Sequence, residues 1–315
     1  MTKELKNQKK ALVTGGAGFI GSNVVKYLIS NDWHVRVLDN FSSGYKENLE
    51  HLNVELIEGD ICNIETSFQA CEGIDVVFHL AACVGRQKSI DNPQLDSNTN
   101  LVGTVNILEG MRKQGVKRIV YSSSAAMFGE LITTSIDENH PQNADSPYGV
   151  SKLAAEKMIL AYSGIYEITG ICLRYFNIYG INQRYDVYGN VIPVFAKCIY
   201  SGIPMTIYGD GLQTRDFVNV KDVAKANYLA GTTDRGTGVY NLGSGGSITI
   251  KQLAEIMQEI SGINTGVKYA PVRVADVKHC KAKTDKVRME LGFEASVELH
   301  EGLSEYMNWF KKNCV

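Results

Sequence analysis

The sequence predicts an α/β fold with a doubly wound parallel sheet, because short apolar runs alternate regularly with segments of helical periodicity. The first apolar run, residues 11–13, leads into a glycine-rich junction, after which apolar residues recur at helical spacing. A second apolar run, residues 34–39, ends in Asp39, 18 residues after Gly21. A strand, a glycine loop, a helix, a strand and an acid in this order indicate a Rossmann-type dinucleotide-binding unit.

The glycine junction, with Gly15, Gly18 and Gly21, is expected to hold the pyrophosphate. Glycines permit a tight turn, close approach of the backbone to phosphate and tight packing of the helix on its strand, and a helix N-terminus favours an anion. Asp39 can accept the ribose hydroxyls of the adenosine. Because residues 40–42 offer no Arg or Lys for a 2′-phosphate, NAD is favoured over NADP. Taken alone, the glycines also suit an ordinary strand-to-helix turn.

Composition and length narrow the class of protein. A chain of 315 residues is long enough for about two domains. Its net charge is −2, with no single-sign run to suggest nucleic acid or an anionic membrane as partner. No apolar stretch approaches the ~20 residues of a membrane span and no signal peptide is recognised, so we expect a cytoplasmic protein. The seven Cys and six His are scattered, and we predict no metal site.

The alternation continues through three further predicted strands, residues 54–57, 75–79 and 118–122. Asp60, just past the first, either lies near the adenine amino group or is a simple turn residue. His79 lies inside the second apolar run, and we expect it to be a core histidine. Small residues follow this strand at positions 81 and 82. They suit either a close approach of the backbone to a ligand or ordinary packing. Residues 98–113 have the pattern of a long buried helix ending before Gly115.

Two segments carry hydroxyl groups suited to chemistry. Three serines, residues 122–124, end the fifth predicted strand and can either hydrogen-bond a substrate or cap a turn. Ser146 can cap a helix that begins at Pro147, which places Tyr148 and Lys152 on one helical face. An ammonium beside a phenol lowers the phenol pKa from about 10 and makes it a usable base. Taken alone, this pair would be surface decoration; after a dinucleotide fold it indicates catalysis.

A sixth strand is predicted at residues 169–175, and the alternation weakens after Arg184. We therefore expect residues 1–180 to form an NAD-binding domain, with part of the later chain returning to it. Residues 181–315 are expected to form mainly a smaller substrate domain. Its predicted helices include residues 249–261, ended by Gly262, and a last helix at residues 299–311.

Taken together, the motifs resemble those of the extended short-chain dehydrogenase/reductases, and among them the nucleotide-sugar 4-epimerases that act on UDP-glucose or UDP-N-acetylglucosamine. The resemblance runs from about residue 10 to about residue 310. Besides the Tyr148/Lys152 pair, the motifs are TGGAGFIGS, DNFSSG, GDI, HLAA, SSSAAMFG, LRYFNIYG, QTRDFVNVKDVAKA and NLGSGGSIT.

The resemblance implies a redox-neutral inversion. Tyr148 would remove the proton from the sugar 4-hydroxyl, Ser124 would hydrogen-bond the same oxygen, and NAD would take the hydride from carbon 4. The 4-keto sugar would turn over in the site and receive the hydride on its other face, which regenerates NAD. Similar enzymes form homodimers through two helices of each subunit, which here are the predicted helices of residues 98–113 and 147–163.

The resemblance also implies binding residues. Guanidinium groups suit a diphosphate, although a single Arg is more often part of a surface ion pair, and a small residue at Cys280 would admit an N-acetyl group. The implied NAD contacts are Gly15, Gly18, Phe19, Ile20, Gly21, Asp39, Asn40, Ser43, Gly44, Asp60, Ile61, Leu80, Ala81, Ala82, Asn100, Tyr148, Lys152 and Tyr175. The implied UDP-sugar contacts are Ser124, Asn177, Asn190, Val191, Tyr208, Arg215, Arg273, Asp276 and Cys280.

The sequence leaves three alternatives to this function. Sugar-nucleotide 4,6-dehydratases carry an acidic pair where this chain has Ala125 and Ala126, which argues against dehydration. The basic segment of residues 84–89 leaves room for an acidic sugar, so a UDP-glucuronate 4-epimerase or decarboxylase is the second hypothesis. A non-catalytic NAD-binding protein on the same fold typically lacks the Tyr or the Lys, and this chain has both.

Overall fold

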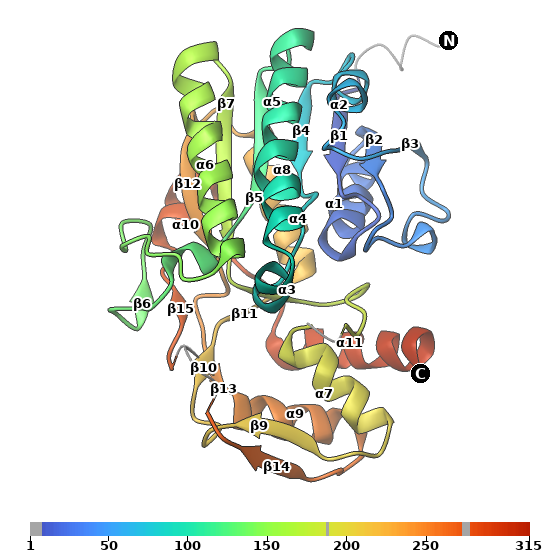
Figure 1. Cartoon of the computed structure of the whole chain (residues 1–315). Helices are drawn as coiled ribbons and strands as arrows, with labels where there is room; N and C mark the ends of the chain where they lie inside the picture. The colour runs from blue at the N-terminus through green and yellow to red at the C-terminus, as the bar shows by residue number, and fades with distance from the viewer. Residues whose placement is uncertain (1–7, 187–188, 273–277) are drawn as a thin grey trace.

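The computed structural model describes residues 8–186, 189–272 and 278–315. Its central sheet consists of β1 (Lys10–Thr14), β2 (His34–Asp39), β3 (Val54–Glu58), β4 (Val76–His79), β5 (Arg118–Ser124), β7 (Thr169–Tyr175) and β12 (Gly238–Leu242). The strands are all parallel and follow the order β12-β7-β5-β4-β1-β2-β3, which confirms the predicted fold (Figure 1). The order reverses between β1 and β4, and ligands bind doubly wound sheets at the carboxyl ends of the strands there.

Helices cover both faces of the sheet because its inner strands bury apolar side chains on both sides, whereas the edge strand β3 has no buried residue. One layer contains α2 (Ile64–Ala70), α5 (Gly103–Gln114) and α6 (Pro147–Tyr166). The other contains α1 (Phe19–Ser30), α8 (Val220–Thr232) and α10 (Asp285–Leu291). The strand β12 and the helices α8 and α10 come from the later part of the chain, so the sheet has a seventh strand beyond the six that the sequence analysis located.

The helix predicted at residues 98–113 begins earlier and is not uniform. Here α4 (Pro93–Ser97) runs into a π-helical turn, η3 (Asn98–Val102), which continues as α5. Ile107, Leu108 and Met111 are fully buried, but Val102 is 46 % exposed, so the prediction of burial along the whole segment was wrong. Gly115 ends α5 in the left-handed conformation, as expected.

Local capping sets the position of α6. The Ser146 hydroxyl accepts the Gly149 N–H, and Pro147 is the first residue of the helix, as predicted. The strand before this region is longer than expected, because Ser123 and Ser124 belong to β5. A 3₁₀ turn, η4 (Ala125–Phe128), follows directly, and the Ser124 hydroxyl accepts the Ala126 N–H at its start.

The rest of the chain forms a lower lobe, in which α7, α9 and α11 pack around a second apolar core (Figure 1). Three two-stranded pairs, β8 with β11, β10 with β13 and β6 with β15, lie between this lobe and the sheet. No helix within the described ranges is long and apolar enough to cross a membrane. The remaining elements are η2 (Lys46–Asn48), α3 (Arg86–Asp91), β6 (Ser135–Ile136), β8 (Asn177–Tyr179), α7 (Val191–Tyr200), β9 (Met205–Tyr208), β10 (Thr214–Arg215), β11 (Phe217–Asn219), β13 (Ile248–Thr249), α9 (Ile250–Ser261), β14 (Val267–Ala270), β15 (Lys281–Ala282) and α11 (Leu299–Cys314).

The start of α9 gives a test of the lower lobe. Thr249 and Gln252 form a reciprocal capping box, so Thr249→Ala should lower the free energy of unfolding by about 1 kcal/mol. Urea denaturation followed by circular dichroism measures this change. The control Lys251→Ala removes an exposed side chain in the same turn and should leave the urea midpoint unchanged. An equal loss in both variants would show that the cap contributes nothing specific.

Candidate active site

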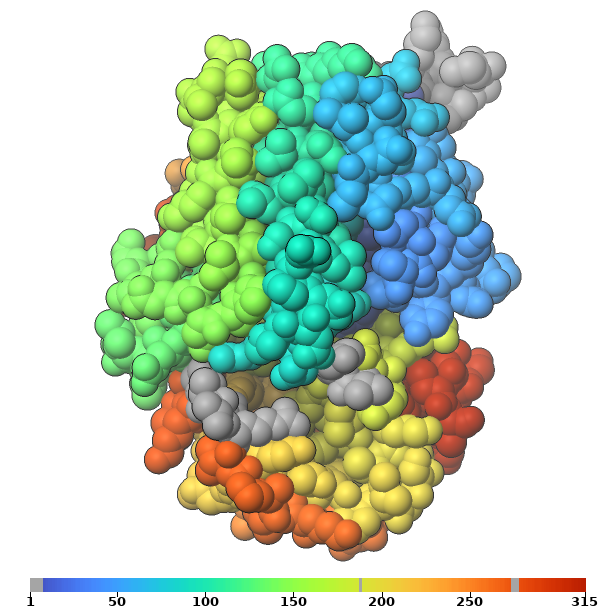
Figure 2. Space-filling model, viewed as in Figure 1, coloured from blue at the N-terminus to red at the C-terminus, as the bar shows by residue number. Residues whose placement is uncertain are grey.

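A cleft of about 1110 Å³ lies along the carboxyl ends of the strands and reaches down to the lower lobe. Figure 2 shows this boundary from the side of α3 and α4, where their teal surface meets the yellow and orange lobe along a hollow. Most predicted site residues line the cleft together. They are Gly15, Gly18, Phe19, Ile20, Gly21, Asp39, Asn40, Ser43, Gly44, Asp60, Ile61, Leu80, Ala81, Ala82, Ser124, Tyr148, Lys152, Tyr175, Asn177, Asn190, Arg215 and Cys280.

The glycine loop is closely packed beneath the cleft. Gly15 has a φ of +67°, and a Cβ there would lie 2.8 Å from the Ala81 Cα, so only glycine lets β1 turn against the end of β4. A Cβ on Gly21 would lie 2.0 Å from the Gly15 carbonyl oxygen. Gly18 is the N-cap of helix α1, which has no side-chain cap and no acid in its first turn. Its first N–H groups therefore suit an anion in the cleft.

Two carboxylates line the adenosine end expected from the sequence. Asp39 accepts the N–H groups of Ala17 at 2.9 Å and Phe41 at 2.8 Å, so it fixes the loops after both β1 and β2. Burial raises the pKa of Asp39, and these two hydrogen bonds act in the opposite direction. Asp60 accepts the Asn40 amide and the Cys62 N–H, and these bonds outweigh burial and lower its pKa.

His79 is a core histidine, as predicted. Its Nδ1 lies 2.7 Å from the Thr14 hydroxyl and its Nε2 lies 2.9 Å from the Thr104 hydroxyl. Complete burial, with a smaller effect of Lys152, lowers the pKa of His79 to about 3. The ring therefore stays neutral at physiological pH and is not a proton acceptor for the cleft.

Ser124, Tyr148 and Lys152 converge on the cleft from the end of β5 and the first turns of α6. The Ser124 hydroxyl lies close enough to the Tyr148 phenol to act on its pKa. The Lys152 side chain is 2 % exposed, and its Nζ lies 4.3 Å from the centroid of the Tyr121 ring. A phenol, a hydroxyl and a buried ammonium at the edge of a dinucleotide cleft form a set suited to moving a proton on and off a substrate hydroxyl.

The predicted direction of the Tyr148 pKa was wrong for this structure. Burial raises the pKa of Tyr148 to about 12, although the hydrogen bond from Ser124 acts to lower it. Lys152 does not offset this burial. Its own burial lowers its pKa to about 7, against the raising effect of Asp96, and its ammonium faces the ring of Tyr121.

Five predicted contacts do not line the cleft or are not described. Asn100 is buried beneath the wall, where its amide bonds both backbone groups of Cys83 and the side chains of Asp96 and Ser151, so it supports the wall instead of contacting the cleft. Val191 begins α7 and Tyr208 ends β9, and neither is among the lining residues. Arg273 and Asp276 lie outside the described residues.

The cleft also has walls that sequence reasoning missed. Arg184 stacks on Tyr45, with 3.9 Å between the guanidinium carbon and the ring centroid, and both line the cleft. No motif connects these two residues, so the sequence carries no signal for the contact. Arg86 on α3 pairs with Asp145 at 3.0 Å, and the Ser89 hydroxyl accepts the Tyr148 N–H. The basic character of residues 84–89 was the only sign that this segment forms a wall.

Comparison with known proteins agrees with this geometry. The model of the NAD dependent epimerase/dehydratase family matches residues 11–243. The chain belongs to this family. It is 31 % identical over 312 residues to the UDP-glucose 4-epimerase of Mycolicibacterium smegmatis, covering 96 % of this chain and 98 % of the relative. The predicted family, enzyme class and cofactor, NAD, are confirmed.

Solved structures extend the comparison to the whole fold. The UDP-glucose 4-epimerase of Thermotoga maritima, solved with UDP-glucose, is 35 % identical with a TM-score of 0.93 and covers 97 % of this chain and 100 % of its own. The UDP-N-acetylglucosamine 4-epimerase of Methanobrevibacter ruminantium, solved with UDP-N-acetylmuramic acid, is 34 % identical with a TM-score of 0.93. The match covers 97 % of this chain and 99 % of that structure.

Among the described residues, no group of three or more His, Cys, Asp or Glu is placed to hold a metal.

Two glycines of the same conformation give a test of the loop. Gly15 and Gly73 have φ values of +67° and +68°, but only a Cβ at Gly15 meets other atoms. Gly73→Ala should lose about 1 kcal/mol of stability to left-handed strain, and Gly15→Ala should lose more because its Cβ also meets the Ala81 backbone. Only Gly15→Ala should also weaken NAD binding, by about tenfold or more, because the loop must move away from Ala81. Calorimetric titration with NAD measures this, and equal affinities would contradict the role given to Gly15.

Proposed function

We propose that this protein interconverts the two 4-epimers of a UDP-hexose, with UDP-glucose and UDP-galactose as substrates, through a transient 4-keto sugar. The observation that carries the proposal is the meeting of Ser124, Tyr148 and Lys152 beside the glycine loop, in a cleft that continues to Arg215. The named activities of the relatives support the same reaction.

The residues present fit NAD as the resident cofactor. The uncapped start of α1 suits its pyrophosphate, and each Asp39 oxygen accepts one backbone N–H and keeps a second lone pair for a ribose hydroxyl. When bound, NAD supplies the acceptor and donor for the hydride of carbon 4. Lys152, buried beside Tyr148 in the same wall, is placed to hold the ribose next to the reacting ring.

Proton movement is assigned to Tyr148. Its phenol oxygen takes the proton of the 4-hydroxyl when the sugar is oxidised and returns it when the sugar is reduced. The Ser124 hydroxyl already acts to lower the Tyr148 pKa, and it is placed to hydrogen-bond the same sugar oxygen. A positive charge close to the phenol favours the phenolate, so a Lys152 ammonium brought closer by bound cofactor would increase the fraction of Tyr148 in its base form.

The far end of the cleft is assigned to the nucleotide. Arg215, on β10, is placed for the diphosphate, and Asn177 and Asn190 also line the cleft. Cys280 leaves a small side chain where the sugar would lie, so we also assign UDP-N-acetylglucosamine and UDP-N-acetylgalactosamine as substrates. The named activity of the Methanobrevibacter ruminantium neighbour supports this extension.

We also propose a homodimer through α6 and through η3 with α5, the helices expected from the sequence. Val102 and Val150 project from η3 and α6 with exposed fractions of 46 % and 54 %. Exposed apolar side chains on adjoining helices are typical of a protein–protein interface.

A hexuronate is the second candidate substrate, because Arg86 and Lys88 line the cleft. The ion pair of Arg86 with Asp145 already satisfies one of these charges, and UDP-glucuronate is therefore placed second. NMR of the products from a panel of UDP-sugars decides the order. Inversion of UDP-glucuronate alone, or release of carbon dioxide from it, would replace the primary assignment.

Removal of one oxygen tests the base. Tyr148→Phe should lower kcat for UDP-galactose by about 10²- to 10⁴-fold and leave NAD bound, because only the proton acceptor is lost. Tyr162→Phe is the matched control on the same helix; its hydroxyl bonds Glu109 away from the cleft, and kcat should stay unchanged. An unreduced kcat in Tyr148→Phe would refute the assignment of the base.

Enlargement of the wall tests the sugar range. Cys280→Tyr should lower kcat/KM for UDP-N-acetylgalactosamine about 100-fold while UDP-galactose remains a substrate, because the ring fills the space for the acetamide. Cys280→Ser keeps the small size and should turn over both substrates, which separates size from thiol chemistry. A wild-type protein that epimerises UDP-galactose but not UDP-N-acetylgalactosamine would disprove the extended range.

A further inference from the structure

A fully buried ion pair joins the catalytic helix to the sheet. The Arg174 Nη2 lies 2.7 Å from the Glu156 Oε1, and its Nε lies 3.1 Å from Oε2, with side-chain exposures of 1 % and 0 %. Removing two charges from water costs several kcal/mol per ion, and an apolar pair would often stabilise such a position as well or better. The pair therefore contributes something other than net stability, and its remaining bonds indicate what that is.

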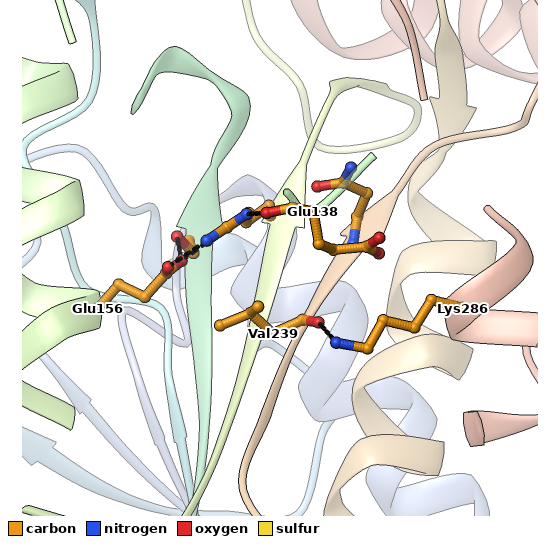
Figure 3. Close-up of polar contacts among 7 residues, drawn as sticks. Glu138, Glu156, Val239 and Lys286 are labelled. Atoms are coloured by element: carbon orange, nitrogen blue, oxygen red, sulfur yellow. Dashed lines mark hydrogen bonds and ion pairs between the residues drawn. The ribbon is translucent and has the colours of Figure 1, made fainter. Parts of the chain in front are cut away.

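Each partner makes a further bond to a different segment (Figure 3). The Glu156 Oε2 accepts the hydroxyl of Ser123 at 2.7 Å. The Arg174 Nη1 donates to the Glu138 carbonyl oxygen at 2.9 Å, and the Glu138 Oε1 accepts the Asn241 N–H at 2.8 Å. The network thus connects α6, β5, β7, β12 and the segment after β6.

The position of Glu156 gives the network its relevance to the site. Glu156 lies one helical turn beyond Lys152 and two turns beyond Tyr148 on α6. Its carboxylate bonds Ser123, the residue before Ser124, at the end of β5. A charged, bidentate pair has one geometry, so it fixes how far α6 lies along β7, and the Ser123 bond fixes it against β5.

The same network extends to the wall that contains Cys280. The Asn241 amide donates to the Ile136 carbonyl oxygen at 2.9 Å, and the Lys283 N–H donates to that oxygen at 2.8 Å. β6 pairs with β15, which begins directly after Cys280. A shift of α6 along the sheet would therefore also disturb the wall opposite the catalytic groups.

We propose that Glu156 and Arg174 are positioning residues, which hold the Tyr148 phenol at the working distance from Ser124 and keep it in register with the wall at Cys280. This rests on the proposed roles of Tyr148 and Ser124. Displacement of a catalytic group by about 1 Å lowers rates by about 100-fold without removing any reacting atom.

The decisive variant replaces both charges with apolar groups of similar length, Glu156→Leu with Arg174→Met. The double variant should fold with the wild-type melting temperature or a higher one, and bind NAD within about threefold of wild type. Its kcat for UDP-galactose should fall about 100-fold with KM changed less than about threefold, because positioning is lost while binding is kept. The exposed pair Asp285 and Arg288 is the control, and Asp285→Leu with Arg288→Met should leave kcat unchanged.

A smaller variant covers the case in which the double variant does not fold. Ser123→Ala removes one bond to Glu156 and should lower kcat about tenfold at an unchanged melting temperature, whereas Ser123→Thr, which keeps the hydroxyl, should restore it. A folded double variant, or Ser123→Ala, with wild-type kcat would overturn the positioning role alone. A wild-type protein that epimerises no UDP-hexose would overturn the proposed function and this assignment with it.

Discussion

One chain of hydrogen bonds beneath the cleft holds the ends of β1 and β4 together, and the cofactor loop depends on it. The Thr14 hydroxyl accepts the N–H groups of Leu80 and Ala81, and so donates its own proton to His79 Nδ1. His79 Nε2–H donates to Thr104, whose hydroxyl donates to the Asn100 carbonyl oxygen. Each bond has one direction, which requires a neutral imidazole protonated on Nε2.

The lowered pKa of His79 keeps these hydrogen bonds intact, because they require a neutral ring. A protonated ring would carry a proton on Nδ1, facing a hydroxyl whose own proton already points there. Burial of the ring among apolar strands prevents that state. The ends of β1 and β4 therefore keep the same position relative to each other near neutral pH. The Gly15 backbone can then pack against Ala81, and the amide groups of α1 face the cleft.

Sequence alone located the turn, the acid and the helix cap at this end of the cleft, because each depends on local chemistry, and their contacts with NAD stay predictions. The turn at Gly15, the acid at Asp39 and the cap at Ser146 each follow from a few adjacent residues. The sequence did not predict the pKa of Tyr148, because helical spacing shows that two side chains share a face but not how deeply they are buried. The position of Asn100 beneath the wall was missed for a related reason, since a motif does not show which side of a wall its amide faces.

The substrate half was harder to predict because its parts are distant in sequence. Arg184 meets Tyr45, and Glu156 meets Arg174, only after the sheet has formed. From sequence, Glu156 has the pattern of a surface residue one turn after Lys152, and Arg174 interrupts an apolar strand without a visible partner. The buried pair is therefore a property of the tertiary fold, and no local pattern indicates it.

The π-helical turn η3 sets how α4 is rotated relative to α5. A π turn contains one residue more than the α-helical register requires, so α4 and α5 keep separate rotational phases about a shared axis. Deletion of one residue in η3 would restore an α-helix and turn α4 by about 100° relative to α5. Asp96 would leave the interior while Ile107 and Met111 stayed in the core. The π-helical turn thus lets α4 face the cleft while α5 keeps its packing against the sheet.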